Sequence, residues 1–374
     1  DDSALAVPQM TIAQQSGGAL GFSGRVLASG KLPGGAATNL LLPVDGRYEG
    51  GNIALWRSCT DIRFDRLELA NLSFEKRGLT LCPARGRAIV NAGADGIRIA
   101  AGAPSLDLQG HLGETPIRLA SGPVGFAYPG VMKAREIEVS LGPVETASRF
   151  NVSGLEARFG DDIAGTFTDA DVMLAAVPMD LNKAEGNWRF ADGRLTINGA
   201  DFTLVDRNAS PRFEPLIERD ARLTLIDNVI AAQAQLRNPA SDRLVTTVDI
   251  RHDLQSGTGH ADLDVPGLQL DDELQPGEIS RLALGVIANT KGIVTGTGRI
   301  DWAPNGTIKS TGSFSSDDLD FAAAFGPVEG ASGTIEFVDL LNLTTAPGQK
   351  IRVASVNPGV EVFDGEVEFQ LRNG

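Results

Sequence analysis

The sequence predicts an all-β protein, a long curled antiparallel sheet forming an open β-groove, with one or a few short helices. Three observations support this fold class. Apolar and polar residues alternate with period two along most of the chain, Asp-Gly or Asn-Gly pairs separate many alternating segments, and the chain contains 44 Gly and 19 Pro. Period two places successive apolar side chains on one face of a strand. So many chain-turning residues favour many short elements.

The segment Asp61–Phe74 illustrates the alternation. Phe64, Leu67 and Phe74 are separated by charged or polar residues. The spacing of such segments along the chain predicts about 25 strands. A twisted sheet of that width usually curls or splits. The alternation alone therefore leaves two arrangements open, two packed sandwiches or one long curled sheet whose apolar side lines a trough.

Turn signals lie between the alternating segments. Asp-Gly and Asn-Gly suit two-residue hairpin turns because both central positions need a positive φ. The pairs are Asp45-Gly46, Asp95-Gly96, Asp192-Gly193, Asn305-Gly306 and Asp364-Gly365. On this basis Trp188–Ile197 and Val360–Leu371 are each predicted to form one complete hairpin.

Few stretches break the alternation. Glu278–Asn289 carries apolar residues at helical spacing, follows Pro276-Gly277 and stops near Gly292, so it is predicted to be a helix. Leu319–Phe325 and Asp339–Leu343 are each long enough for a single turn of helix.

The two cysteines are Cys59 and Cys82. An even, low count separated by strand-like segments favours one disulfide in an oxidising compartment. Such a bond would stabilise the fold by roughly 3 kcal/mol in the chain-entropy model. The alternative of two buried free thiols stays open.

The net charge of the chain disfavours some classes of binding partner. Thirty-three basic and 48 acidic residues give a formal charge of −15. Nucleic acid is disfavoured because phosphate binding needs clustered Lys and Arg, and strong adsorption to an anionic bilayer is disfavoured for the same reason. No apolar run reaches the roughly 18–20 residues that span a bilayer. The chain begins at Asp1 and is interpreted as a piece whose membrane anchor lies elsewhere.

No motif in the sequence predicts catalysis, a cofactor or a metal. Phosphate-loop, dinucleotide-binding and nucleophile-elbow patterns are absent. His252 and His260 can approach each other across a hairpin, but only Asp253 or Asp262 is available as a third metal ligand. Solvent-facing strand positions are the preferred interpretation of both histidines. The chain is therefore predicted not to be an enzyme.

Aromatic usage favours apolar contacts over sugar binding. There are 16 Phe against three Trp and two Tyr. The side chains of Trp and Tyr combine an apolar ring with a group that donates a hydrogen bond, whereas the side chain of Phe is entirely apolar. This composition suits a core or acyl chains better than a lectin surface.

The C-terminal third resembles a known family. The segments that carry the resemblance are His252-Asp253-Leu254, Gly296–Trp302, Asp318–Val328, Gly333–Leu341 and Asp364–Leu371. They are similar to the C-terminal domain of YdbH-type proteins of Gram-negative bacteria, part of the AsmA-like group that includes TamB. The similarity is good over about residues 238–371 and weaker toward the N-terminus, where Cys59 and Leu81-Cys82-Pro83 are the further matches.

The resemblance implies a periplasmic protein anchored in the inner membrane, with a long β-groove and a role in moving phospholipid between the two envelope membranes. It brings no catalytic residues and no cofactor. An older label of the family, dicarboxylate transport, is disfavoured because such a site needs converging Arg and Lys donors. The basic residues here are scattered between apolar positions.

Two expectations on organisation and partners follow. Residues 1–150 are expected to form an N-terminal β segment with the disulfide, and residues 151–374 a YdbH-like C-terminal β-groove domain. The last predicted strand, Val367–Leu371, would be a sheet edge, and such edges need protection or serve as docking sites. It is expected to pair with an outer-membrane protein or lipoprotein, while phospholipid is the expected ligand.

The candidate groove residues are the larger apolar side chains of the clearest alternating strands. They are Phe64, Leu67, Leu69, Phe74, Ile137, Val139, Trp188, Phe190, Leu195, Ile197, Phe202, Leu204, Leu223, Leu225, Ile300, Trp302, Phe314, Ile335, Phe337, Val367, Phe369 and Leu371. Which face of each strand lines a groove is open, because a one-residue register slip inverts the assignment.

Three functions stay open from the sequence. The preferred one is a lipid-holding conduit with an open apolar trough. The second is a structural envelope scaffold of closed sandwiches, and the third a small-anion or sugar-binding protein with a compact pocket.

Overall fold

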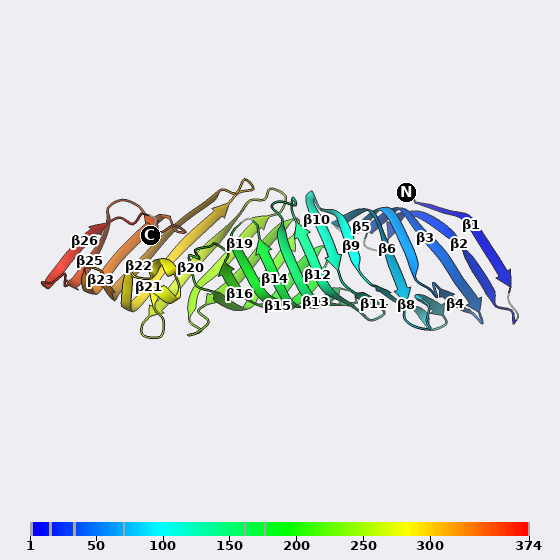
Figure 1. Cartoon of the computed structure of the whole chain (residues 1–374), viewed down its shortest axis with the longest axis horizontal. Coiled ribbons are helices and arrows are strands. Elements are labelled where there is room, and N and C mark those ends of the chain that lie inside the picture. The colour runs from blue at the N-terminus through cyan, green and yellow to red at the C-terminus, as the bar shows by residue number, and fades with distance from the viewer. Residues whose placement is uncertain are drawn as a thin grey trace. The chain divides into compact units, whose positions relative to one another are not determined.

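The computed structural model describes residues 3–14, 17–32, 35–69, 72–160, 162–175 and 177–372 (Figure 1). These residues form a hydrogen-bonded sheet of 26 strands, and the pairings between them are antiparallel. The all-β antiparallel fold class is thus confirmed. The chain divides into two compact units, unit 1 with Asp1–Ala170 and Asn187–Arg194, and unit 2 with Asp171–Gly186 and Leu195–Gly374.

The first fifteen strands follow the alternating segments of the sequence. In chain order they are β1 (Ala4–Gln14), β2 (Leu20–Leu32), β3 (Gly35–Glu49), β4 (Asn52–Leu55), β5 (Thr60–Leu69), β6 (Leu72–Pro83), β7 (Val90–Gly93), β8 (Gly96–Ala103), β9 (Leu106–Leu112), β10 (Thr115–Ser121), β11 (Val124–Tyr128), β12 (Val131–Leu141), β13 (Ser148–Phe159), β14 (Ile163–Leu174) and β15 (Met179–Ala191).

The remaining elements include two short 3₁₀ helices. They are β16 (Arg194–Asp206), β17 (Leu216–Ile226), β18 (Val229–Arg237), β19 (Leu244–Asp253), β20 (Gly259–Leu270), η1 (Pro276–Glu278), η2 (Arg281–Ala283), β21 (Ile287–Trp302), β22 (Ile308–Ala323), β23 (Gly326–Asp339), β24 (Thr344–Thr345), β25 (Gln349–Val356) and β26 (Val362–Phe369).

Unit 1 contains a branched stretch of sheet. After β1, β2 and β3 have paired in order, β3 pairs with β5 through its first half and with β4 through its second half. One branch runs through β5, β6, β9 and β10 to β12. The other runs through β4, β7, β8 and β11 to the same strand. β3 and β12 therefore each belong to both branches.

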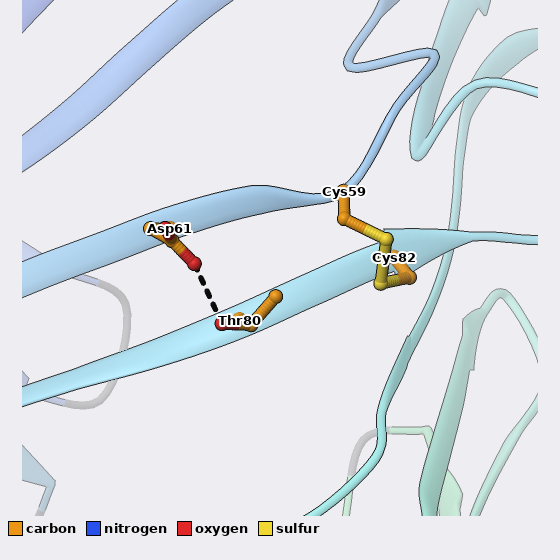
Figure 2. The surroundings of a disulfide bond; sticks show 4 residues. All are labelled: Cys59, Asp61, Thr80 and Cys82. Atoms are coloured by element: carbon orange, nitrogen blue, oxygen red, sulfur yellow. Dashed lines mark hydrogen bonds between the residues drawn. A yellow bond between two sulfur atoms is a disulfide. The ribbon is translucent and has the colours of Figure 1, made fainter.

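The disulfide lies where β5 and β6 meet (Figure 2). Cys59 immediately precedes β5, Cys82 lies in β6, and their Cα atoms are 4.0 Å apart. Beside them, the hydroxyl of Thr80 donates a hydrogen bond of 2.6 Å to the carboxylate of Asp61. The predicted Cys59–Cys82 disulfide is confirmed.

Unit 2 is a meander. From β16 to β23 each strand pairs with the next one along the chain. β23 then pairs with the short β24 and with β25, and β25 pairs with β26. In Figure 1 these strands run from the green to the red part of the chain.

Strands bend at residues with left-handed backbone conformation. Asn39, Glu136, Asp169, Lys183 and Asn289 lie inside strands with φ between 50° and 54°. Such a residue in a strand locally disrupts the ladder and bends the strand. In β12 the bend separates the half that pairs with β11 from the half that pairs with β10.

A small buried side chain directly follows several of these residues. Ala170 follows Asp169, and its side chain is 2% exposed. Ala184 follows Lys183 and is 6% exposed.

The turn predictions were right at some Asp-Gly pairs and wrong at others. Asp192 and Gly193 have φ of 50° and 74° and join β15 to β16, as expected of a type I′ turn. Asp45-Gly46 instead lies inside β3, and the chain turns at Gly50 and Gly51, which have positive φ.

The predicted hairpin Val360–Leu371 is also wrong. Asp364-Gly365 lies inside β26, which pairs with β25. Asp364 has a φ of 51°, so here the Asp-Gly pair accommodates an irregularity within a strand. A two-residue hairpin turn and such an irregularity both require a positive φ.

The predicted helix Glu278–Asn289 is wrong as well. The segment contains η2 and the end of η1, and its last residues already belong to β21. Leu284 is extended, with φ −63° and ψ 124°, and Gly285 has a φ of 76°. Both conformations interrupt a helix. Leu319–Ala323 continues β22, and residues 340–343 form a hydrogen-bonded turn.

Candidate functional site

The first three strands present an apolar face. The β1–β2 register places Met10 opposite Gly24 and Ile12 opposite Phe22. The β2–β3 register continues this row with Gly46 opposite Phe22. Directly opposed residues of an antiparallel pair point to the same side of the sheet. Met10 and Ile12 remain 43% and 66% exposed, so this face offers apolar surface that the sheet itself does not cover.

An open pocket of about 250 Å³ lies on the same face. Leu5, Ala28, Ala37 and Leu40 contribute to its lining. The registers place Leu5 opposite Ala28 and Ala28 opposite Leu40, so these side chains share one side of the sheet. The arrangement suits a short apolar segment of a ligand.

A second pocket of about 310 Å³ is more polar. Its lining includes Thr11, Ser23, Asp45, Arg47 and Arg57. Arg47 forms an ion pair of 2.8 Å with Glu49, so one of the two guanidinium groups in the pocket already has a carboxylate partner. The mixture of carboxylate and guanidinium groups gives this pocket no excess of anion-binding donors.

Next to the apolar pocket, strand residues of unit 1 form a cluster that we call the N-terminal cluster. Its buried members are Phe64, Phe74 and Leu108, on β5, β6 and β9. Leu40, Leu67, Leu72, Leu79, Ile117 and Leu119 pack against them. All of these residues belong to strands. Among the described residues, the cluster is thus built by the apolar face of the sheet and includes none from connections.

Unit 2 contains a larger group, the central cluster. Its buried members are Leu216, Leu236, Val245, Val248, Ala261 and Ile300. The partly buried residues packed against it include Phe213, Ile279 and Leu341, which lie in connections between strands. Part of this apolar face is therefore covered by the chain's own connections.

Polar contacts hold the covering segment in place. The hydroxyl of Ser280 donates to the carbonyl of Arg212 over 2.9 Å. Arg281 Nε lies 2.6 Å from Glu214 Oε1, and the amide of Glu214 donates to the carbonyl of Ile279 over 2.9 Å. These contacts join the η1–η2 segment to the β16–β17 connection.

The last strands form the C-terminal cluster. Val328, Ala331 and Val353 are its buried members, and Leu319, Phe321, Ile351, Val356 and Val367 pack against them. Nearby, the rings of Phe314 and Phe337 make an edge contact with centroids 5.9 Å apart.

Ion pairs occupy exposed positions along the strands. Lys133 lies opposite Glu156 in the β12–β13 register and pairs with it at 2.8 Å. This contact lowers the pKa of the Glu156 carboxyl below its usual value, first through the hydrogen bond from Lys133. Arg299 similarly lies opposite Asp262 and pairs with it at 2.7 Å. Apolar and charged residues thus alternate between the two faces, as period two predicts.

A buried carboxylate lies beside the central cluster. The side chain of Asp206 is fully buried and accepts a hydrogen bond of 2.7 Å from Arg212 Nε. Burial alone would raise the pKa of Asp206, but hydrogen bonds from the side chain and backbone of Arg212 and from the backbone of Asn208 lower it overall. This ion pair fixes the start of the β16–β17 connection, which carries Phe213.

His252 forms a hydrogen bond with Trp302, a residue that packs against the central cluster. Trp302 Nε1 donates a hydrogen bond of 3.1 Å to His252 Nδ1, which must be unprotonated to accept it. Burial lowers the pKa of His252 below its ordinary value. His260 Nε2 instead lies 3.7 Å from Asp262. Among the described residues, no group of three or more His, Cys, Asp or Glu is arranged to hold a metal ion.

The sequence-predicted candidates are buried or half-buried wherever the structure describes their side chains. The clusters bring together Phe64, Leu67 and Phe74 in the N-terminal cluster, Phe202, Leu204, Ile300 and Trp302 in the central cluster, and Val367 in the C-terminal cluster. Cross-strand pairs bring together Leu195 with Leu225, Ile197 with Leu223, and Phe314 with Ile335. Phe337 contacts Phe314.

Other candidates are not members of these groups, although Val139 lies opposite Leu119 of the N-terminal cluster. Ile137, Val139, Trp188, Phe190, Phe369 and Leu371 are outside the three clusters as the described residues define them. The side chain of Leu69 lies outside the described part of the structure.

Sequence reasoning missed several cluster members. Leu40, Leu108, Val248 and Val353 were not among the candidates although they are buried or pack in the clusters. Three of them lie in period-two pairs, and that signal could have included them. The connection residue Ile279 gave no such signal, because its contact with the central cluster depends on how the η1–η2 segment folds back.

The comparisons with known proteins identify the family. A family model described as YdbH-like, intermembrane phospholipid transport protein YdbH, matches residues 2–374. Searches among curated proteins and among solved structures gave no match. In the described residues, no helix has the length and apolar character needed to cross a membrane. The match covers nearly the whole chain, including the N-terminal part, and the chain belongs to the YdbH-like family of intermembrane phospholipid transport proteins.

Proposed function

We propose that this chain holds the acyl chains of phospholipid against the apolar face of its sheet and passes lipid between the inner and outer membranes. The observation that carries the proposal is the exposed apolar face of β1, β2 and β3 with its adjoining open pocket. Burying a methylene contributes about 0.8 kcal/mol wherever it occurs. An acyl chain can therefore shift between equivalent apolar positions against small barriers.

The proposed contact set begins with the candidates predicted from the sequence. We extend it with Leu5, Met10, Ile12 and Leu40, which belong to the apolar face or the pocket of the first three strands. Ion pairs on exposed positions of other strands fit a binding mode in which headgroups stay in water. The role is binding and transfer, without catalysis.

One observation favours a second candidate, a structural scaffold. Phe213, Ile279 and Leu341 pack against the central cluster, and a closed apolar core of this kind needs no lipid. In that case the same residues stabilise the envelope protein only through their own packing.

A photo-crosslinking experiment separates the two functions. A photoreactive phenylalanine derivative at Ile12 is expected to crosslink phospholipid in cells labelled with radioactive phosphate. The matched control carries the same residue at Thr11, whose side chain points to the other face of β1. Equal labelling at both positions, or none at Ile12, would contradict the proposal. Native mass spectrometry of the purified protein gives an independent count of bound phospholipid.

We also propose a protein partner at the last strand. β26 pairs with β25 alone among the described strands. A free strand edge is a template for another chain. An outer-membrane protein or lipoprotein that adds a strand here would extend the sheet. Recovery of the same partner by pull-down after deletion of Glu366–Gly374 would refute this.

The family description implies a location between the two membranes of the cell envelope. We propose that an anchor outside these residues holds the protein in the inner membrane. Fractionation of the full-length protein tests this, since recovery in the soluble periplasmic fraction would contradict it.

A further inference from the structure

Large exposed apolar residues gather at one edge of unit 2, in consecutive connections between strands. Leu284 and Val286 in the β20–β21 connection, Phe325 in the β22–β23 turn and Val360 in the β25–β26 turn are 62%, 45%, 51% and 76% exposed. Phe363, at the start of β26, is exposed as well. We call these five residues the apolar edge.

The strand registers place these connections side by side. Ile287 lies opposite Ala323, and Ala323 opposite Gly326, so the β20–β21 connection ends beside the β22–β23 turn. The amide of Asn357 donates to the carbonyl of Pro327 over 3.0 Å, which places the β25–β26 turn next to the same strand end. The three connections therefore form one continuous edge of unit 2.

The opposite edge of unit 2 has a different composition. Its turns contain Asp227-Asn228 between β17 and β18, Gln255-Ser256 between β19 and β20, and Asn305-Gly306 between β21 and β22. In the described part of these turns no large apolar residue is exposed, although Ile226 and Val338, near the ends of β17 and β23 on this edge, are 37% and 56% exposed. Unit 2 therefore exposes more large apolar residues at one edge than at the other.

Two basic side chains near the apolar edge are paired, and the acidic Glu361 lies between Val360 and Phe363 of the edge itself. Arg281 pairs with Glu214 at 2.6 Å, and Lys291 lies 3.6 Å from Asp272. Basic side chains free to attract anionic lipid are what polybasic membrane contacts require, and these two have carboxylate partners. Any attraction of this edge for a surface therefore comes from its apolar side chains.

We propose that the apolar edge inserts into the interfacial region of a phospholipid bilayer. Large apolar side chains bind there without electrostatic help, because their transfer out of water is favourable. Separate protruding turns suit a fluid interface, which adapts to each side chain, better than a rigid protein groove. The proposal rests on the proposed function in one respect: a chain that takes up or releases phospholipid has to meet a bilayer.

Vesicle binding tests the proposal directly. The wild-type protein is expected to float with phosphatidylcholine vesicles, with binding that changes little between low and high salt. The variant Leu284→Ser/Phe325→Ser/Val360→Ser is expected to bind at least tenfold more weakly. The matched control Val144→Ser/Ile226→Ser/Val338→Ser changes residues that are 88%, 37% and 56% exposed elsewhere and should bind like the wild type. Equal binding of the two variants would overturn the proposal.

A fluorescent probe locates the contact. The two cysteines of the chain form a disulfide, so a cysteine introduced as Phe325→Cys can be labelled selectively with an environment-sensitive dye. Addition of phosphatidylcholine vesicles is expected to shift its emission to the blue, and a dye on Val338→Cys should not respond. Absence of the shift at Phe325→Cys, or an equal shift at both positions, would overturn the proposal. So would a dimer in sedimentation velocity that the triple edge variant abolishes.

Lipid content distinguishes this proposal from the proposed function. Phosphate analysis of the purified edge variant is expected to give the same phospholipid per chain as the wild type. A wild-type protein that carries phospholipid but does not bind vesicles overturns the apolar edge alone. A protein that binds vesicles through this edge but never carries phospholipid supports the edge and contradicts the lipid-holding function.

Discussion

The N-terminal and central clusters differ in which residues cover the apolar face of the sheet. Both gather apolar residues from neighbouring strands, around Phe64 in the first and around Ile300 in the second. In the part of the chain that the structure describes, the members of the N-terminal cluster all lie in strands, whereas connections of unit 2 pack Phe213, Ile279 and Leu341 against the central cluster. The proposed lipid binding therefore makes different demands on the two clusters. Connections would have to move away from the central cluster before acyl chains reached it, whereas the N-terminal cluster has no such cover among the described residues.

Both clusters are expected to stabilise the fold, and substitutions in them should lower the free energy of unfolding by different amounts. Phe64→Ala in the N-terminal cluster removes a side chain that is 3% exposed and should lower the free energy of unfolding of lipid-free protein by about 4 kcal/mol. Leu236→Ala in the central cluster, at 6% exposed, should lower it by about 3 kcal/mol. Urea unfolding measures both. A loss at Phe64 below about 1 kcal/mol would mean that the N-terminal cluster is not a stabilising core.

The disulfide lies in unit 1, and its removal should cause the next largest loss of stability. Removing it with Cys59→Ala/Cys82→Ala should lower stability by about 3 kcal/mol, because the unfolded chain regains the freedom of the closed loop. Hydrogen exchange should become faster in β5 and β6 and stay unchanged in β21 and β22. As a control, Thr80→Val removes only the neighbouring hydrogen bond to Asp61. Faster exchange throughout both units would contradict a local effect.

The cover of the central cluster can be weakened separately. Ile279→Ala should lower stability by about 1 kcal/mol, since its half-buried side chain loses about half of its transfer free energy. The exposed cluster should then bind a hydrophobic dye more strongly and accept lipid crosslinks near Trp302. Leu284→Ala, a change at an exposed neighbouring position, serves as the control. Unchanged dye binding by Ile279→Ala would indicate that the connection does not limit access.

The smallest expected effect depends on pH. The folded-state pKa of His252 lies below its ordinary value of 6.5, so the unfolded chain binds more protons as the pH falls through that value. The stability contribution of neutral His252 is present above about pH 6.5 and declines at lower pH. Urea midpoints and tryptophan fluorescence at pH 7.5 and 5.5 should report this, and His252→Gln should remove the dependence. His111→Gln, in unit 1, should retain it.

The repeated strand pattern could be predicted from sequence because period two is a direct consequence of strand geometry. Phe64, Phe74 and Ile300 were selected on that basis and are buried in clusters. The disulfide was also predictable, because the chain has only two cysteines and strand-like segments separate them.

Other features depend on contacts that the pattern does not contain. Asp192-Gly193 and Asp364-Gly365 look alike in sequence, but one turns the chain and the other lies inside β26. The bends at Glu136 and Lys183 have no Asn, Asp or Gly to indicate a positive φ. Between Glu278 and Asn289 the apolar residues have helical spacing, but Gly285 has a φ of 76°, and this conformation interrupts a helix.

The meander of unit 2 has a consequence for how such a chain is made. From β16 to β23 every strand pairs with its successor, so each strand can pair with the one before it as soon as it has been made. Contacts between near neighbours in sequence close only short loops, which speeds their formation. The same architecture lets a duplication or loss of one hairpin leave all other pairings intact, and evolution can then lengthen or shorten the protein two strands at a time.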